Sequence, residues 1–306
     1  MQYTVKSPVT FKGVGLHSGA PVRMTIHPAS AEYGIWFRRT DVTHKDNLIA
    51  ARWDSVNPAR LCTRIENADG VSVSTVEHIM AALAGLGIHN ALIEISNGEV
   101  PILDGSAAPF VRAILARGML QQQAPVRVWR ILESVEVRDG DAVARLDPAQ
   151  GFEMRFEIEF ADTAIGRQVK HLDLSNGAFV RELCDSRTFC RSADVDFMRA
   201  NGMALGGTME NAVVVDGDRV LTPGGLRHDD EPVRHKMLDA LGDLYLAGAP
   251  ILGRYTGRRA GHALTAALLH AVFSRPGAAC LTVVDQRFAA RLPGVGVRQE
   301  DLALCA

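Results

Sequence analysis

The stretch EPVRHKMLDALGD, residues 231–243, places four side chains that can bind metals or move protons within a few turns of one predicted helix. At about 100° per residue, Asp239 lies about 40° from His235, Asp243 about 80° and Lys236 about 100° from it. Apolar residues fill the opposite side. The helix is therefore predicted to bury one face and to present a compact polar stripe on the other.

Two interpretations of this stripe are open from the residues alone. The simpler one is a solvated helix face with His–Asp and Lys–Asp neighbour pairs, and the pattern alone favours it. The other is a metal site, because His235 and Asp239 at positions i and i+4 point the same way. A catalytic zinc ion takes three protein ligands and leaves one position open, so a third ligand would have to come from another segment.

A second candidate segment is STVEHIMAALAGLG, residues 74–87, a predicted helix with apolar residues at spacings of three and four and glycines at its end. His78 is a lone histidine on this helix, and such residues are commonly satisfied core histidines. Glu77 follows Ser74 at the spacing of a capping box, which the pattern alone favours over catalysis. The alternative is a carboxylate beside a ligand histidine, placed to take the proton of an attacking water.

Other histidines have simpler explanations. His262 opens a predicted helix after a glycine, and a capping or surface role explains it. The helix N-terminus would disfavour the cationic form of this histidine, and a nearby carboxylate would offset that effect. His228, Asp229 and Asp230 lie in a predicted loop, which fixes ligand geometry poorly. His17, in GVGLHSG, is ambiguous by itself. The glycines match neither a P-loop nor a dinucleotide fingerprint, so neither ATP nor NAD is predicted.

Composition narrows the class of protein. The chain has 306 residues, 47% of them hydrophobic, and 33 basic against 35 acidic residues give a net charge of −2. One large or two smaller globular domains are expected, and nucleic acid is not a predicted partner because its binders usually carry a basic surplus. No apolar run approaches the roughly 20 residues that span a bilayer. The start lacks a signal-peptide core, and five scattered cysteines without a CxxC pair indicate reduced thiols, so a cytoplasmic location is expected.

The order of predicted elements indicates an α+β protein of two domains with similar plans. The polar, proline-containing segment 121–126 is the predicted linker, giving an N-terminal domain 1–123 and a C-terminal domain 124–306. The predicted elements are strands within 3–28 and at 90–95, helices at 74–87 and up to 118, strands within 127–160, helices at 192–202, 231–245 and 261–273, a hairpin at 211–221 and a strand at 279–284.

Several long motifs together resemble one family. They are GVGLHSG, RRTD, STVEHIMAALAGLGIHNALIEI, PILDGSAAPFV, SRTF, LGGTMENAVVVD and LRHDDEPVRHKMLDALGDLYLAG. In this order, from about residue 3 to about residue 290, the sequence is similar to the UDP-3-O-acyl-N-acetylglucosamine deacetylases, zinc enzymes of lipid A biosynthesis in Gram-negative bacteria.

The resemblance implies a metal centre and an acid–base pair. His78, His235 and Asp239 match the family's zinc ligands, with Fe²⁺ as the alternative metal. Glu77 matches the general base that activates the attacking water. His262 matches the protonated imidazole that gives its proton to the leaving amine.

The resemblance also implies supporting and substrate-binding residues. Asp243 matches the carboxylate that supports His262, Thr188 the hydroxyl that helps hold the oxyanion, and Lys236 a substrate contact near the sugar. Arg191 is our own hypothesis: we expect it near the acyl or nucleotide exit, where it would shift substrate preference. The positions implied for the substrate cleft and acyl passage are Leu61, Cys62, Phe189, Gly207, Thr208 and the strand from Ala212 to Val214.

The implied activity is hydrolysis of the N-acetyl group of UDP-3-O-(3-hydroxyacyl)-N-acetylglucosamine, with release of acetate, the committed step of lipid A biosynthesis. The implied fold is two similar α+β domains packed face to face as a sandwich, with the active site in the cleft between them. The expected partner is the acylated UDP-sugar. A monomer is expected, without a transmembrane segment, and with transient membrane-surface contact as a further expectation.

The sequence departs from the family pattern at a few positions. His89 stands where an acid is usual, Cys190 and Arg191 follow the cleft phenylalanine, and Ala204 and Asn211 lie along the acyl passage. None of these is a proposed metal or acid–base residue. Two other functions remain open: a zinc hydrolase of a different N-acyl sugar or amide, and a non-catalytic binder of nucleotide sugar or lipid. The second predicts a broken metal constellation, whereas all its members are present.

Overall fold

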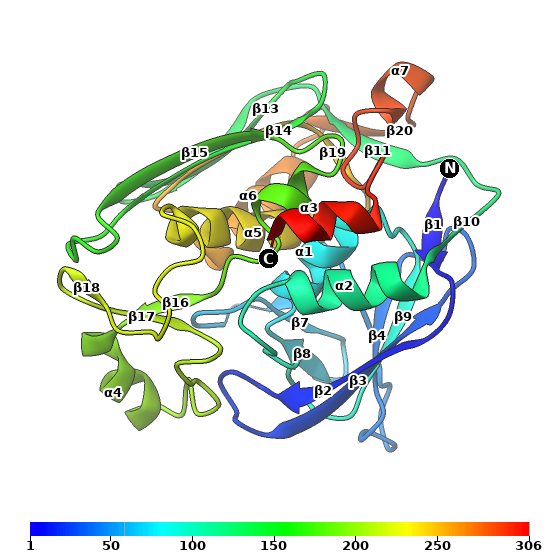
Figure 1. The fold of residues 1–306 in the computed structure, drawn as a ribbon. Coiled ribbons are helices and arrows are strands. Elements are labelled where there is room, and N and C mark those ends of the chain that lie inside the picture. The colour runs from blue at the N-terminus through cyan, green and yellow to red at the C-terminus, as the bar shows by residue number, and fades with distance from the viewer. Residues whose placement is uncertain (58, 306) are drawn as a thin grey trace.

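Two groups of β-sheet with helices packed between them make up the molecule (Figure 1). The computed structural model describes residues 1–57 and 59–305. Every strand pairing in the described residues joins strands on the same side of residue 123. The predicted α+β class with facing sheets is therefore confirmed. The pairing pattern supports the division at residue 123, which stays a prediction.

The N-terminal half is built on a five-stranded sheet in the order β2-β3-β9-β4-β5, in which only β4 and β9 pair in parallel. The strict alternation of PVRMTIHP buries Val22, Met24 and Ile26 on one face of β3. The strands of this half are β1 (Tyr3–Val5), β2 (Val9–Val14), β3 (Pro21–Pro28), β4 (Ile35–Arg39), β5 (Leu48–Ala50), β6 (Val56–Asn57), β7 (Arg64–Glu66), β8 (Ser72–Ser74), β9 (Ala91–Ile95) and β10 (Met119–Gln121).

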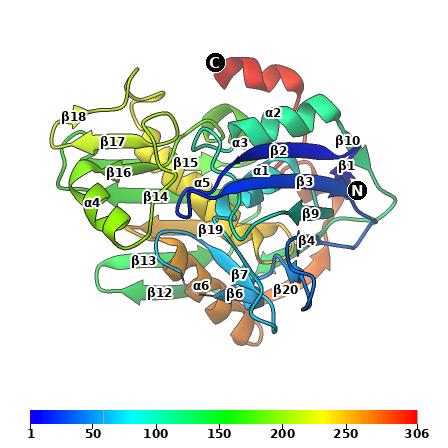
Figure 2. The same ribbon diagram turned by 90° about the horizontal axis from the view of Figure 1, so that it is seen from below.

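Helix α1 (Glu77–Leu86) is buried along its whole length, while α2 (Ala108–Arg117) buries one face. The predicted helix end at Gly87 is confirmed, because Gly87 adopts a left-handed φ of 68° that terminates α1. A helix that is apolar nearly all round must be enclosed on every side. Here α1 lies between the N-terminal sheet and the helices of the C-terminal half (Figure 1), so β2 and β3 lie in front of it in the view from below (Figure 2).

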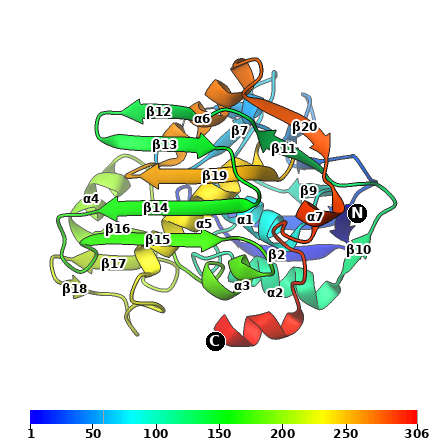
Figure 3. The same ribbon diagram turned by 90° about the horizontal axis from the view of Figure 1, so that it is seen from above.

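The C-terminal half is built on a seven-stranded sheet with β19 at its centre, flanked by β13 and β14 and continued through β11 (Figure 3). Its strands are β11 (Arg127–Ile131), β12 (Val135–Asp139), β13 (Ala142–Asp147), β14 (Phe152–Glu159), β15 (Arg167–Asp173), β19 (Ile251–Arg258) and β20 (Ala279–Val283). A small sheet, β16 (Phe189–Arg191), β17 (Val213–Asp216) and β18 (Arg219–Val220), carries α4 (Ser192–Ala200) at one edge of the molecule.

The central strand β19 is not among the strands that the sequence predicts. Its sequence ILGRYTGR contains two glycines, which ordinarily weaken a strand. Both have a packing reason: a Cβ on Gly253 would lie 2.8 Å from the side chain of Ile131, and one on Gly257 would lie 2.7 Å from the ring of Phe156. The glycines give room to neighbouring side chains, which no local pattern reveals.

Helices that lie beneath the C-terminal sheet pack against the N-terminal half (Figure 1). The longest, α5 (Glu231–Tyr245), packs most extensively on α1. The remaining helical elements are η1 (Trp53–Ser55) in the N-terminal half and α3 (Ala178–Glu182), α6 (His262–Ser274), α7 (Gln286–Ala289) and η2 (Gln299–Cys305) in the C-terminal half.

Gly242 allows α5 to approach the first turn of α1. A Cβ added at Gly242 would lie 2.0 Å from the backbone oxygen of Glu77, a distance that real side chains do not tolerate. The backbones of the two helices therefore approach closely at the residue where α1 begins. This crossing brings the polar residues of both helices into one place.

Candidate metal centre and active site

Three potential metal ligands from the two crossing helices converge at one point. His78 comes from α1, and His235 and Asp239 come from successive turns of α5. One ligand atom from each lies within 4.8 Å of the others. Asp239 Oδ1 is 3.5 Å from His78 Nε2 and 3.3 Å from His235 Nε2. The imidazole rings, with centroids 5.0 Å apart, are nearly perpendicular, and the Nε2 atoms of both rings point at the same Asp239 oxygen.

The hydrogen bond of His235 prepares its other nitrogen for a metal. Nδ1 lies 3.0 Å from the carbonyl oxygen of Ser186 and donates its proton there, which leaves the lone pair on Nε2. Burial lowers the pKa of His235 to about 4, so the ring is neutral at physiological pH. A neutral imidazole with its tautomer fixed by a backbone carbonyl is the form that ligates metals.

Asp239 has one oxygen that protein atoms leave unsatisfied. Oδ1 is buried and has no hydrogen-bond partner among the described residues, whereas Oδ2 accepts a bond of 3.0 Å from Lys236 Nζ. Burial opposes ionisation, but the surrounding groups, among them the cationic Lys236 that donates to Oδ2, lower the pKa of Asp239 well below its usual value. A buried, ionised oxygen without a partner is unfavourable in a protein alone. The donor set therefore fits a divalent cation such as zinc, with room for one further ligand.

Burial overturns the simpler interpretation of the stripe on α5. The exposed fraction is 2% for His235, 5% for Asp239 and 3% for Asp243. The stripe is thus not a solvated face. It is covered by α1 and by the loop that follows β6, because the N-terminal half packs onto it.

The capping-box prediction for Glu77 is wrong. Helix α1 begins at Glu77 itself, its N-cap is Val76, and no side chain caps it. Glu77 Oε2 instead accepts a hydrogen bond of 3.0 Å from the backbone N–H of Thr63. Burial raises the pKa of Glu77 above its ordinary value. A buried carboxylate with a raised pKa beside the candidate metal ligands has the properties of a general base.

His262 lies across the site from Glu77 and is held by a carboxylate. Its Nδ1 is 2.9 Å from Asp243 Oδ2, and its Nε2 is 3.9 Å from Glu77 Oε1. Asp243 is itself fixed by a hydrogen bond of 2.6 Å from the hydroxyl of Thr63. Burial alone lowers the pKa of His262, but Asp243 and Glu77 raise it to about 9. The imidazole is therefore protonated at neutral pH and can serve as an acid.

Thr188 and Phe189 lie on a segment next to the triad. The ring centroid of Phe189 is 6.3 Å from that of His235. Thr188 is half-buried, two residues after the carbonyl that binds His235, and its backbone bridges the two halves through bonds of 2.8 Å to Gly105 and from Val213. The structure thus brings this segment to the candidate centre; the role of the Thr188 hydroxyl remains a prediction.

The residues predicted to line the substrate passage fall on two loops and on the paired strands β16 and β17. Leu61 is 56% exposed with a φ of 64°, and the buried Cys62 follows it directly before Thr63. Gly207 and Thr208 lie on the loop that leads into β17. Ala212 and Val214 flank Val213, which is the register partner of Phe189.

Arg191 is anchored within the small sheet. Its guanidinium pairs with Asp162 and lies 3.7 Å from Asp194. Asp162 also accepts a bond from the backbone of Gly217, so the pair ties the β16–β18 sheet to the loop after β14. Cys190, next to it, is half-buried, and burial raises the pKa of its thiol.

Other departures lie in turns. Asn211 closes its own turn by accepting from Thr208 N at 2.8 Å and donating to Gly206 O at 3.0 Å. Ala204 has a left-handed φ of 54°. His89 accepts a bond of 3.1 Å from the backbone of Tyr3, and burial lowers its pKa to about 4, so it serves the packing of β1.

The remaining histidine candidates stay outside the triad. His228, in the loop before α5, lies 2.9 Å from Asp185, in agreement with the predicted loop role. The backbone of His17 is held by Glu99, and its Nδ1 accepts from Ala204 N at 3.4 Å. His17 thereby joins the N-terminal loop to the loop that carries Gly207.

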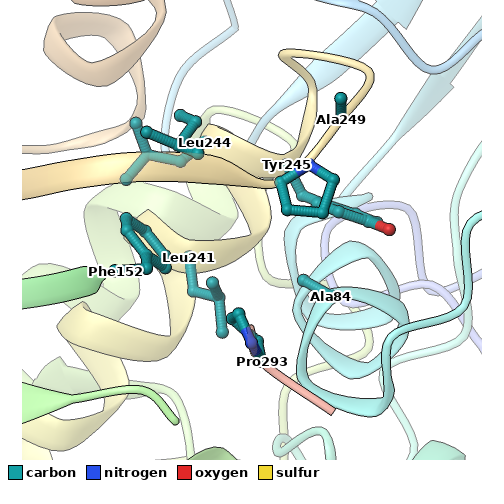
Figure 4. A pocket seen from close by; sticks show the side chains of 9 residues that line it. Ala84, Phe152, Leu241, Leu244, Tyr245, Ala249 and Pro293 are labelled. Atoms are coloured by element: carbon teal, nitrogen blue, oxygen red, sulfur yellow. The ribbon is translucent and has the colours of Figure 1, made fainter. Parts of the chain in front are cut away.

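Two cavities differ in size and in distance from this chemistry. The larger, about 430 Å³, is lined by Lys236, Arg259 and neighbours on β14, beside the helix that begins at His262. The smaller, about 20 Å³, lies at the far end of the α1–α5 interface (Figure 4). Only the larger one has room for part of a substrate.

Sequence reasoning missed two residues that hold the site together. Thr63 contacts both Glu77 and Asp243, and the carbonyl of Ser186 orients His235. Threonine and serine carry no distinctive signal at these positions, and two of the three contacts use the backbone. Only the position of Thr63 directly after the predicted Cys62 places it near the site.

Fold and site together define an α+β protein with a buried candidate mononuclear metal centre between two halves, flanked by a carboxylate and a cationic histidine. No helix among the described residues is long and apolar enough to cross a membrane.

The family model of UDP-3-O-acyl N-acetylglycosamine deacetylase matches residues 2–274, and the chain belongs to this family. It is 53% identical over 277 residues to the UDP-3-O-acyl-N-acetylglucosamine deacetylase of Phenylobacterium zucineum, covering 90% of this chain and 94% of that protein. It is 47% identical over 279 residues to the protein of that name from Shewanella oneidensis, covering 90% and 91%.

Proposed function

We propose that this chain hydrolyses the N-acetyl group of UDP-3-O-(3-hydroxyacyl)-N-acetylglucosamine and releases acetate, the committed step of lipid A biosynthesis. Its family and the names of its relatives support this substrate. The observation that carries the proposal is the buried cluster of His78, His235 and Asp239 beside Glu77 and His262.

We assign a single zinc ion to the three ligands. Two imidazoles and one carboxylate suit zinc, and Fe²⁺ is the alternative metal. When bound, the ion polarises the amide carbonyl and lowers the pKa of water. The unsatisfied oxygen of Asp239 and the fixed tautomer of His235 support the assignment.

Proton transfer in the proposed reaction belongs to Glu77 and His262. Glu77 takes a proton from water as the water oxygen bonds to the acetyl carbon. When the C–N bond breaks, the sugar nitrogen needs a proton, because an amide anion is a very poor leaving group. His262 supplies it, and Asp243 holds the ring in place. We assign Thr188 as a hydrogen-bond donor to the oxyanion.

The substrate positions follow from the surroundings of the centre. The cavity of about 430 Å³ beside Lys236 is the space that we assign to the sugar-nucleotide portion. The acyl chain would extend past Phe189 along the segments that carry Leu61, Cys62, Gly207 and Thr208. A cytoplasmic location is part of the proposal, supported by the unbridged thiols of Cys62, Cys190 and Cys280. A monomeric state and transient membrane contact stay predictions.

The proposal is tested by following acetate release from the acylated UDP-sugar by purified protein before metal removal, after chelation and after return of zinc. Activity should be lost with the metal and restored with it. A parallel assay uses UDP-N-acetylglucosamine without the acyl chain, which should be a much poorer substrate. Equal turnover of both substrates would favour the alternative, a hydrolase of other N-acyl sugars. No hydrolysis of either would refute the proposed activity.

A further inference from the structure

The polar stripe on α5 begins one turn before the metal ligands, at Glu231. Glu231, His235, Asp239 and Asp243 recur every four residues, so all four side chains share one face. Glu231 is 1% exposed, as buried as the ligands themselves. It contacts neither a metal ligand nor a catalytic group through any bond described above, and the proposed reaction does not use it.

Both carboxylate oxygens of Glu231 accept hydrogen bonds, from Arg187 and from Arg227. Its Oε1 accepts bonds of 2.9 Å from both the backbone N–H and the Nε of Arg187. Its Oε2 accepts a bond of 3.0 Å from Arg187 Nη2 and one of 2.7 Å from the backbone of Arg227. Arg187 Nη2 also donates to the carbonyl of Gly225 at 2.7 Å. These charge-assisted bonds fix both the side chain and the backbone of Arg187.

The segment fixed in this way carries two groups of the candidate centre. Immediately before Arg187, the carbonyl of Ser186 accepts the hydrogen bond from His235 Nδ1. Immediately after it comes Thr188. A buried ion pair contributes little net stability compared with well-packed apolar residues, but its directional bonds define one geometry. The geometry defined here is the placement of the peptide 186–188 against α5.

We propose that the buried Arg187–Glu231 pair is a positioning device, which holds the Ser186 carbonyl against His235 and the Thr188 hydroxyl at the reaction centre. Neither residue touches the substrate or the metal. The pair acts through its neighbours: it fixes the ring orientation of one ligand and the location of one oxyanion donor. The part that concerns Thr188 rests on the proposed function, whereas the part that concerns His235 requires only that the site binds a metal.

The test compares Glu231→Gln with Asp230→Asn in the full-length protein. Asp230 is the matched control, because it pairs with Lys170 and Arg234 at the same end of α5 and makes no described bond to residues 186–188. Zinc affinity is measured by competition with a chromophoric chelator, and kcat and KM with the acylated UDP-sugar. Glu231→Gln should weaken zinc binding about 10- to 100-fold, as outer-shell changes typically do. It should also lower kcat more than it raises KM.

A second pair of variants tests the same proposal if Glu231→Gln does not fold. Arg187→Lys retains the charge but not the forked donor, whereas Arg187→Met removes both. Arg187→Lys should recover part of the zinc affinity that Arg187→Met loses. The proposal is overturned if the folded Glu231 and Arg187 variants bind zinc like Asp230→Asn and differ from wild type only in thermal stability. If wild type binds zinc but does not deacetylate, the proposed function fails while the zinc comparison still decides the role of the pair.

Discussion

The two ends of the α1–α5 interface use the same pair of helices for opposite purposes. At one end, Glu77 and His78 of α1 meet His235, Asp239 and Asp243 of α5, all buried and all polar. At the other end the lining is apolar and encloses only a small cavity (Figure 4). The residues at this second end include Ala84, Phe152, Leu241, Leu244, Tyr245 and Pro293.

The difference shows how a buried polar site is supported. Burying ionisable groups is unfavourable unless they are paired or bind a metal. The apolar end contributes favourable packing over the same helix pair, and Gly242, next to the polar end, permits the close approach. Stability and chemistry are therefore expected to separate along one interface. Mutations at the two ends test this separation.

The largest effect on stability is expected from Leu244→Ala at the apolar end. Leu244 is 1% exposed, and its truncation should reduce the free energy of unfolding by about 2–5 kcal/mol. Urea denaturation measures this loss. Zinc affinity and kcat of the folded protein should stay at wild-type values. A parallel loss of zinc affinity would show that the two ends are not separable.

Gly242→Ala should affect both properties, because it acts at the crossing itself. The new Cβ would lie 2.0 Å from the backbone oxygen of Glu77, so the helices must move apart. Overpacking of this kind typically destabilises by about 1–3 kcal/mol. Since His78 moves with α1, zinc affinity should fall as well. Leu244→Ala on the same helix is the control, and unchanged zinc affinity in Gly242→Ala would argue against the crossing as the determinant of site geometry.

The pH dependence of activity sharpens the description of the polar end. The pKa of His262 in the folded protein is about 9, against an unfolded value of about 6.5. Because the acid must be protonated, kcat should fall as pH rises through about 9. The stability that protonated His262 contributes is complete below about pH 6.5 and is lost as pH rises toward 9.

Asp243→Asn is the variant for this profile. Asp243 is the main group that raises the pKa of His262, so its neutralisation should move the alkaline limb of kcat to lower pH. If the alkaline limb of the kcat profile does not move in Asp243→Asn, His262 is not the general acid.

The smallest effect is expected from Arg191→Ala, away from the α1–α5 interface. Arg191 is partly exposed and tied to Asp162, and exposed ion pairs contribute little. We expect kcat/KM to change by about fivefold or less, and unequally for substrates of different acyl length. Arg199→Ala on the exposed face of α4 is the control. Identical kinetics across acyl lengths would end the hypothesis that Arg191 influences substrate preference.

The sequence predicts which residues form the site better than it predicts whether those residues are buried. The spacing of His235 and Asp239 and the family resemblance predict the triad that the structure brings together. The spacing by itself favours a solvated helix face, because local periodicity does not show what covers a helix. Burial of the stripe depends on the approach of α1, which Gly242 permits.

The errors have the same origin. The capping box failed because Glu77 Oε2 binds the backbone of Thr63, fourteen residues earlier, rather than the start of its own helix. Strand β19 was missed because Gly253 and Gly257 serve contacts with distant side chains. The orienting carbonyl of Ser186 is backbone, which no residue type encodes. Tertiary contacts decide each of these points.

The central claim is that two helices assemble a metal centre with a separate general base. It is tested most directly by measuring bound zinc and acetate release together in wild type, His78→Ala and Glu77→Gln. His78→Ala should lose zinc. Glu77→Gln should keep zinc at the wild-type ratio and lose about 100- to 10,000-fold in kcat. Wild-type turnover in Glu77→Gln, or full zinc occupancy in His78→Ala, would contradict the account.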